Sequence, residues 1–155
     1  MNVTSRALLG ALGGLGGTLV LTVFRKALAA VGAVGTTAPE QVIERIEELG
    51  FLENSSPGVR RMLVILAHIT YGAGTGAALG LLRRERGGAG EEAAVGSALG
   101  ILAWGAGWAS WLPLTGVHLP PWKQRTAKVL LPVLDHAVFG AVWGLVYRFV
   151  RSGRV

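Results

Sequence analysis

Residues 68–84 read HITYGAGTGAALGLLRR and combine a long apolar run with regularly spaced glycines. Gly72, Gly76 and Gly80 follow His68 at intervals of four residues. Residues four apart lie along one face of an α-helix. Glycine on such a face allows another helix backbone to come close. The stretch therefore predicts a packed helix whose histidine points toward the neighbouring helices.

A second stretch, HAVFGAVWGLVYRFVRS at 136–152, repeats the same frame 68 residues later. His68 then corresponds to His136, and Gly72 and Gly76 correspond to Gly140 and Gly144. A looser match relates GALGGL at 10–15 to SALGIL at 97–102. These matches predict two copies of a helical hairpin, repeat 1 at about 6–84 and repeat 2 at about 91–152, within one membrane domain covering 1–155. Parallel repeats of this kind are found in transporters, and they also build simple helix bundles.

The composition points to a membrane rather than to a soluble domain. Hydrophobic residues make up 51% of the chain and charged residues 15%, whereas soluble domains have about 25% charged residues. A membrane-spanning helix needs about 20 mostly apolar residues. The chain is therefore expected to be an all-α bundle of four spanning helices, at roughly 6–33, 58–82, 91–112 and 126–150. A secretory signal peptide is an alternative interpretation of the first segment.

The connection at 36–56 predicts a short amphipathic helix that lies on the membrane surface or caps the bundle. Thr37 is a candidate N-cap, and Gly50 is a candidate C-terminal stop. Ser55 or Ser56 before Pro57 marks the start of the second spanning helix. Residues that support the amphipathic helix are Pro39 and Glu40 in its first turn and the apolar stripe Val42, Ile43, Ile46 and Leu49.

Ionisable residues inside the apolar segments form a candidate intramembrane cluster. Arg25 and Lys26, His68, and Asp135 and His136 fall at similar depths on three helices. Charges at such depth are costly and are usually paired, so Asp135 is expected to pair with Arg25 or Lys26. Three roles remain open for the cluster: hydrogen bonds that hold helices together, a proton or ion pathway, or axial haem ligation by the two histidines.

Seven glycines on i, i+4 rows are expected to mediate helix packing. They are Gly10, Gly14, Gly72, Gly76, Gly80, Gly140 and Gly144.

Tryptophans mark the third helix and the loop that follows it. Trp104, Trp108 and Trp111 share one helical stripe. This stripe is interpreted as packing against lipid, with a face for a pigment, quinone or lipid as the alternative. Trp111 and Trp122 are expected to anchor the chain at the membrane interface, and His118 is expected to be solvated.

Several functional classes are disfavoured by the sequence. The net charge of +6 comes from basic residues that flank apolar runs, so no nucleic-acid partner is expected. The chain has no cysteine, and no catalytic constellation or metal-spaced cluster stands out. We therefore expect no enzyme, no metal and no cofactor.

Four spans put both termini on one side of the membrane, and the flanking basic residues are almost equally divided between the two sides. If Arg25 and Lys26 lie within the first helix, the balance tips toward both termini in the cytoplasm.

Four motifs together resemble a known family. They are a glycine-rich first helix leading to APE at 38–40, HITYG at 68–72, LPLTG and PPW between 112 and 122, and HAVFG at 136–140. This pattern resembles the YagU-like group of small bacterial inner-membrane proteins. The resemblance implies a multi-pass membrane bundle and no established reaction, ligand or catalytic residue. The expected function is that of a structural or accessory membrane component with the lipid bilayer, a second copy or a membrane complex as partner. The alternatives are a small proton or ion transporter and a membrane haem protein.

Overall fold

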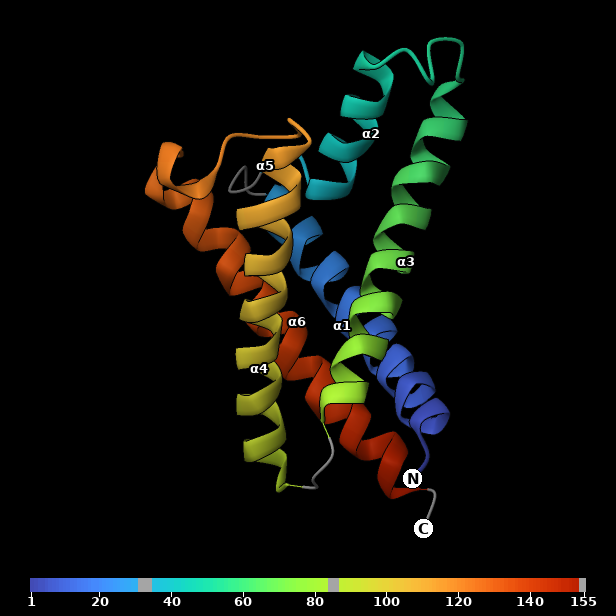
Figure 1. Ribbon diagram of the computed structural model, residues 1–155, viewed down its shortest axis with the longest axis vertical. Coiled ribbons are helices and arrows are strands. Elements are labelled where there is room, and N and C mark those ends of the chain that lie inside the picture. The colour runs from blue at the N-terminus through green and yellow to red at the C-terminus, as the bar shows by residue number, and fades with distance from the viewer. Residues whose placement is uncertain (31–34, 84–86, 154–155) are drawn as a thin grey trace.

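The computed structural model describes residues 1–30, 35–83 and 87–153, and every regular element in these ranges is helical. The expected all-α architecture is therefore confirmed (Figure 1). The last residues of the first predicted span, 31–33, and three basic residues of the topology count, at 84, 86 and 154, lie outside the described ranges. The elements are α1 (Val3–Ala30), α2 (Ala38–Glu48), α3 (Pro57–Leu82), α4 (Ala89–Ala106), a π turn (Gly107–Trp111), α5 (Leu112–Leu114), a 3₁₀ turn (Pro121–Lys123) and α6 (Thr126–Ser152).

Four of these helices are long and apolar enough to cross a membrane. They are α1, α3, the continuous helix Ala89–Leu114, and α6 from Lys128. The chain alternates in direction through them, so the N- and C-termini lie together at one end of the bundle, called the terminal end here (Figure 1). The segment α2 and the loop around residues 115–125 lie at the opposite end, called the cap end.

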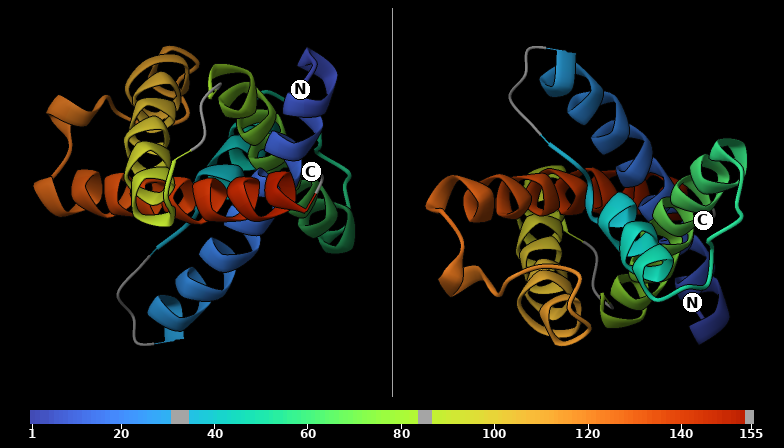
Figure 2. Two further views of the ribbon diagram at one scale, coloured as in Figure 1. Left: turned by 90° about the horizontal axis from the view of Figure 1, so that it is seen from below. Right: turned by 90° about the horizontal axis from the view of Figure 1, so that it is seen from above.

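The four long helices form two close pairs, α1 with α3 and α4 with α6, and α1 crosses α6 between them (Figure 2). Glycine determines both pairings. A Cβ atom added at any glycine of these contacts would come within 3.0 Å of an atom of the partner helix. The glycines concerned are Gly10, Gly14, Gly72, Gly76 and Gly80 in the first pair, and Gly96, Gly100, Gly140 and Gly144 in the second. All seven glycines expected to mediate packing are among them.

The glycine contacts align α1 with α4 differently from the predicted match between residues 10–15 and 97–102. Gly72 lies against Gly14, and Gly140 lies against Gly96. Aligning Gly72 with Gly140 therefore aligns Gly14 with Gly96, an offset of 82 residues. The predicted match of GALGGL with SALGIL implies an offset of 87, which these contacts do not follow. Glycine and leucine matches arise easily in helices rich in both residues, whereas the contact register depends on which glycines meet.

A stripe of aromatic residues on α6 fills the crossing with α1. Phe139 and Trp143 contact the glycines Gly17 and Gly13 of α1, which have no side chain to hold α6 away. The fully buried Trp143 indole also donates from Nε1 to two helix carbonyls, Gly10 O at 3.0 Å and Gly76 O at 3.2 Å. Trp143 therefore joins α6 to both helices of the first pair.

The helix α2 forms as its sequence predicts. Thr37 and Glu40 make a reciprocal capping box, because each side chain bonds the other residue's backbone N–H. At the other end, Gly50 adopts a φ of 84°, a conformation that favours glycine. Arg45 then donates from Nε to Thr115 O at 3.3 Å, which ties α2 to the loop after α5. The helix thus closes over the cap end of the bundle.

A buried ion pair joins α3 to α4 at the terminal end. Glu92 is only 2% exposed and faces Arg83 in a bidentate contact, with Nε to Oε2 at 3.1 Å and Nη2 to Oε1 at 3.2 Å. These bonds raise the pKa of the Arg83 guanidinium above its ordinary value. Glu92 also accepts the Gly87 N–H at 2.8 Å. A buried carboxylate therefore links the end of α3 to the start of α4.

Candidate functional site

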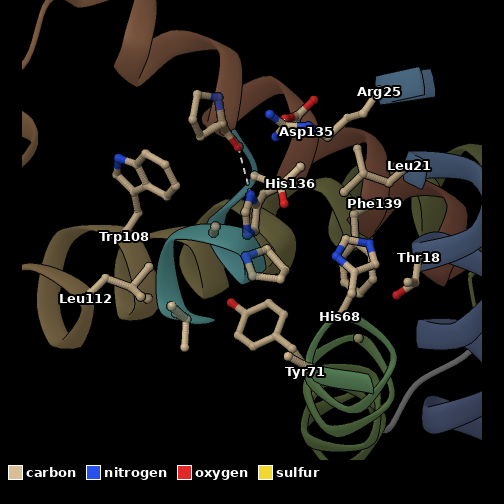
Figure 3. A pocket seen from close by; sticks show the side chains of 18 of the residues that line it. Thr18, Leu21, Arg25, His68, Tyr71, Trp108, Leu112, Asp135, His136 and Phe139 are labelled. Atoms are coloured by element: carbon tan, nitrogen blue, oxygen red, sulfur yellow. Dashed lines mark hydrogen bonds and ion pairs between the residues drawn. The ribbon is translucent and has the colours of Figure 1, made fainter. Parts of the chain in front are cut away.

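A cavity of about 340 Å³, called the inner cavity here, lies in the cap-end half of the bundle. Its wall is formed by α1, α2, α3, the π turn and α6, and most of the lining is apolar. Figure 3 shows Trp108 and Leu112 on one side of it and Thr18 and Leu21 on the other, with both histidine rings between them. Small-molecule sites in proteins are cavities of this type, with volumes of about 300 to 1,000 Å³ and few polar groups.

The inner cavity is lined on one side by a buried ion pair between α1 and α6. Arg25 Nη1 lies 2.6 Å from Asp135 Oδ2, and the Asp135 side chain is 1% exposed. The second carboxylate oxygen, Oδ1, is buried and has no hydrogen-bond partner among the described residues. An unsatisfied buried carboxylate oxygen is costly. Only one of the two Asp135 carboxylate oxygens therefore has a hydrogen-bond partner among the described residues, and the side chain lines a cavity.

Of the two basic residues expected beside Asp135, the structure places Arg25 there and not Lys26. Successive residues of an α-helix point about 100° apart, so two neighbours do not share one face. Arg25 continues the buried face of Gly17 and Leu21, whereas the Lys26 side chain is exposed. The expectation that Lys26 belongs to the intramembrane cluster is therefore wrong.

The hydrogen bonds of His68 define its tautomer. The Thr22 hydroxyl donates its single proton to Thr18 O at 2.8 Å. Its contact with His68 Nε2 at 3.3 Å must then be accepted by the hydroxyl oxygen. A neutral His68 therefore carries its proton on Nε2 and keeps Nδ1 as an acceptor. This assignment follows from the bonding network.

His136 has the opposite tautomer. Its Nδ1 lies 2.8 Å from Pro132 O, and a carbonyl oxygen can only accept a hydrogen bond. A neutral His136 therefore carries its proton on Nδ1 and keeps Nε2 as an acceptor. Both rings line the inner cavity together with Asp135, so the structure brings the three residues into one site.

The π turn directs Trp108 into the site. A straight helix would place Trp104, Trp108 and Trp111 on one stripe, but the π turn at Gly107–Trp111 changes the helical phase at this point. Trp108 lines the inner cavity, which favours the alternative interpretation of this residue as part of a binding face. Its ring also lies 4.2 Å from the ring of His118, which is half-buried rather than solvated.

The two expected interfacial tryptophans have exposed side chains at the cap end. Trp111 is 42% exposed and Trp122 is 74% exposed. Trp111 has a second role, because part of it also lines the inner cavity.

A second, more open cavity of about 740 Å³ adjoins the inner one and shares Arg25, Trp108 and Pro132 with it. We call it the outer cavity. Its described lining contains the basic residues Lys123, Arg125 and Lys128 and no acidic residue. The site as a whole therefore has a basic entrance at the cap end and an apolar interior, with the Arg25–Asp135 ion pair on the side where the two cavities meet.

No protein-family model, curated protein or solved structure matches this chain. The resemblance to the YagU-like group therefore stays a prediction. Among the described residues, no group of three or more His, Asp or Glu side chains has the spacing of a metal site.

Proposed function

We propose that this chain is a non-enzymatic accessory protein of the cytoplasmic membrane that holds a small, largely apolar molecule in its inner cavity. The observation that carries the proposal is the inner cavity itself, an apolar space lined by the buried Asp135 carboxylate, one oxygen of which has no donor among the described residues. The surrounding helices are packed backbone to backbone through glycine.

The proposal is tested by filling the cavity. Ala67 lines the inner cavity, and an Ala67→Phe substitution places a large ring in that space. Ala98 on α4 is exposed and lines neither cavity, so Ala98→Phe is the matched control. A ligand that binds the folded state raises its stability. A total lipid extract of the host membrane is expected to raise the melting temperature of delipidated wild type and Ala98→Phe, but not of Ala67→Phe. Equal shifts in all three proteins would contradict ligand binding in the inner cavity.

Proton or ion transport is a second candidate, supported by Asp135, His68 and His136 lining one cavity. Chains of such groups carry protons in membrane pumps. The bundle on the terminal side of this cluster is filled by Trp143 and Tyr147, both fully buried, so conduction would require these residues to move. Proton flux into liposomes, compared between wild type and Asp135→Asn, tests this candidate. Equal flux in both proteins would exclude it.

Haem ligation has less support from the geometry. An axial pair needs a free nitrogen on each ring directed at the iron. The Nε2 atom of His68 is in contact with Thr22, so ligation through that atom would require this contact to break. A visible absorption spectrum of the purified protein tests the haem candidate, since a Soret band would support it.

We also propose that both termini lie in the cytoplasm. Both Arg25 and Lys26 are inside α1 rather than in a loop, which leaves the terminal end with the larger number of flanking basic residues. The proposed partner, a second copy or a membrane complex, would bind elsewhere than on the seven expected glycines, because these pack within the chain.

A further inference from the structure

The inner cavity is lined by hydrogen-bond acceptors for which the described residues provide no donor. Asp135 Oδ1 has no donor among the described residues, and the neutral rings of His68 and His136 keep Nδ1 and Nε2 as acceptors. A molecule that is complementary to these acceptors must therefore donate a hydrogen bond to them. A hydroxyl group does this without bringing a charge.

The charges beside the cavity favour an uncharged ligand. Arg25 and Asp135 already neutralise each other across 2.6 Å, so a cationic or an anionic ligand would bring into the site a charge that has no partner. Charges without a partner are strongly disfavoured in an apolar site. The remaining choice is a neutral molecule with a hydroxyl group at the end directed toward Asp135.

The walls favour an aromatic ring over an aliphatic chain. Tyr71, Trp108, Trp111 and Phe139 come from three different segments and contribute to the same lining. Aromatic rings stack with offset or edge-to-face geometry, and this adds to the stabilisation from apolar burial. A flat ring can use several of these contacts at once.

We propose that the inner cavity binds an uncharged lipophilic phenol or hydroquinone whose ring hydroxyl donates a hydrogen bond to Asp135 Oδ1. This inference rests on the proposed function, since it names the chemical class of the molecule held in the cavity. The phenol ring lies among the aromatic side chains that line the cavity.

The test uses an octyl-substituted bromophenol and its methyl ether as probes on the full chain in lipid nanodiscs. Bromine quenches tryptophan fluorescence only at contact distance, and Trp108 and Trp111 line the cavity. Partition into lipid gives quenching that rises steadily with probe concentration, whereas a bound molecule gives a saturable component. Wild type, Ala67→Phe and Ala98→Phe are compared with both probes.

A saturable component is expected with the phenol for wild type and Ala98→Phe, and its loss is expected for Ala67→Phe. The methyl ether, which cannot donate a hydrogen bond, should bind about tenfold more weakly or worse. Equal affinity for phenol and ether would overturn this inference and leave the proposed function standing. Absence of a saturable component for both probes also overturns it, and the lipid-extract experiment then decides whether another class of molecule occupies the cavity.

Discussion

Arg25 on α1 and Asp135 on α6 are 110 positions apart in the chain, and Nη1 of the first lies 2.6 Å from Oδ2 of the second. This pair links the two helices that cross at the centre of the bundle. Both residues also line the inner cavity, so the same contact supports both the fold and the proposed binding site.

Removing one partner of this ion pair should lower the free energy of unfolding more than removing both partners. An Asp135→Ala change leaves the Arg25 charge in the bundle without its partner, which typically destabilises a protein by about 3 to 5 kcal/mol. The double change Arg25→Ala with Asp135→Ala removes both charges and should cost less. Reversible unfolding in mixed micelles measures the difference. Strictly additive single effects would show that the two side chains do not interact.

The glycine contacts predict that alanine substitutions at two nearby positions of α3 have different effects on stability. A Cβ at Gly76 would come within 3.0 Å of the α1 backbone at Gly10 and Gly14, whereas a Cβ at Gly74 meets nothing within 4 Å. Gly76→Ala should therefore destabilise the bundle by about 1 to 3 kcal/mol through overpacking. Gly74→Ala should be neutral or stabilising by up to about 1 kcal/mol, because alanine favours helix formation. Equal melting temperatures for the two variants would contradict the observed packing.

The burial of Glu92 at the terminal end predicts that its substitution destabilises the protein more than the same substitution at the adjacent Glu91. Glu92 is 3% exposed at its side chain, while Glu91 is 56% exposed, although both bind Arg83. Glu92→Gln weakens a buried charged contact and should destabilise the protein by about 1 to 3 kcal/mol. Glu91→Gln weakens an exposed contact, for which losses of about 0 to 1 kcal/mol are usual. Thermal unfolding followed by circular dichroism compares them, and a larger effect at Glu91 would refute this assignment.

Membrane orientation can be measured by cysteine labelling, because the chain contains no cysteine of its own that would react. Single cysteines are introduced at Ser152, at the terminal end, and at Lys123, at the cap end. With cytoplasmic termini, a membrane-impermeant maleimide should label Lys123→Cys in right-side-out vesicles and label Ser152→Cys only after permeabilisation. The reverse pattern would place the termini outside.

Local features of this fold were predictable because neighbouring residues determine them. The capping box at Thr37 and Glu40 and the stop at Gly50 depend on a few adjacent positions. The four long helices follow from runs of apolar residues. The Arg25–Asp135 pair could be predicted because only charged residues at matching depths on different helices can form an ion pair.

Features that depend on helix rotation and crossing were not predictable in the same way. Depth alone did not separate Arg25 from Lys26, since only the rotation of α1 decides which one faces α6. The π turn changes the direction in which Trp108 points, and no residue pattern in the sequence predicts this turn. The burial of Glu92 was missed because acidic residues in a short polar turn are usually solvated.

One missed feature did leave a signal in the sequence. Phe139, Trp143 and Tyr147 recur every fourth residue on α6, and Gly13 and Gly17 have the same spacing on α1. Large rings on one helix and missing side chains on another are complementary in shape. Pairing these two rows would have predicted the central crossing of α1 and α6.

The most direct test of the central claim is native mass spectrometry of the protein released from its own membrane. Ligand binding in the inner cavity predicts one small molecule bound per chain in wild type and Ala98→Phe, and none in Ala67→Phe. The same bound mass in Ala67→Phe, or no bound mass in folded wild type, would contradict it.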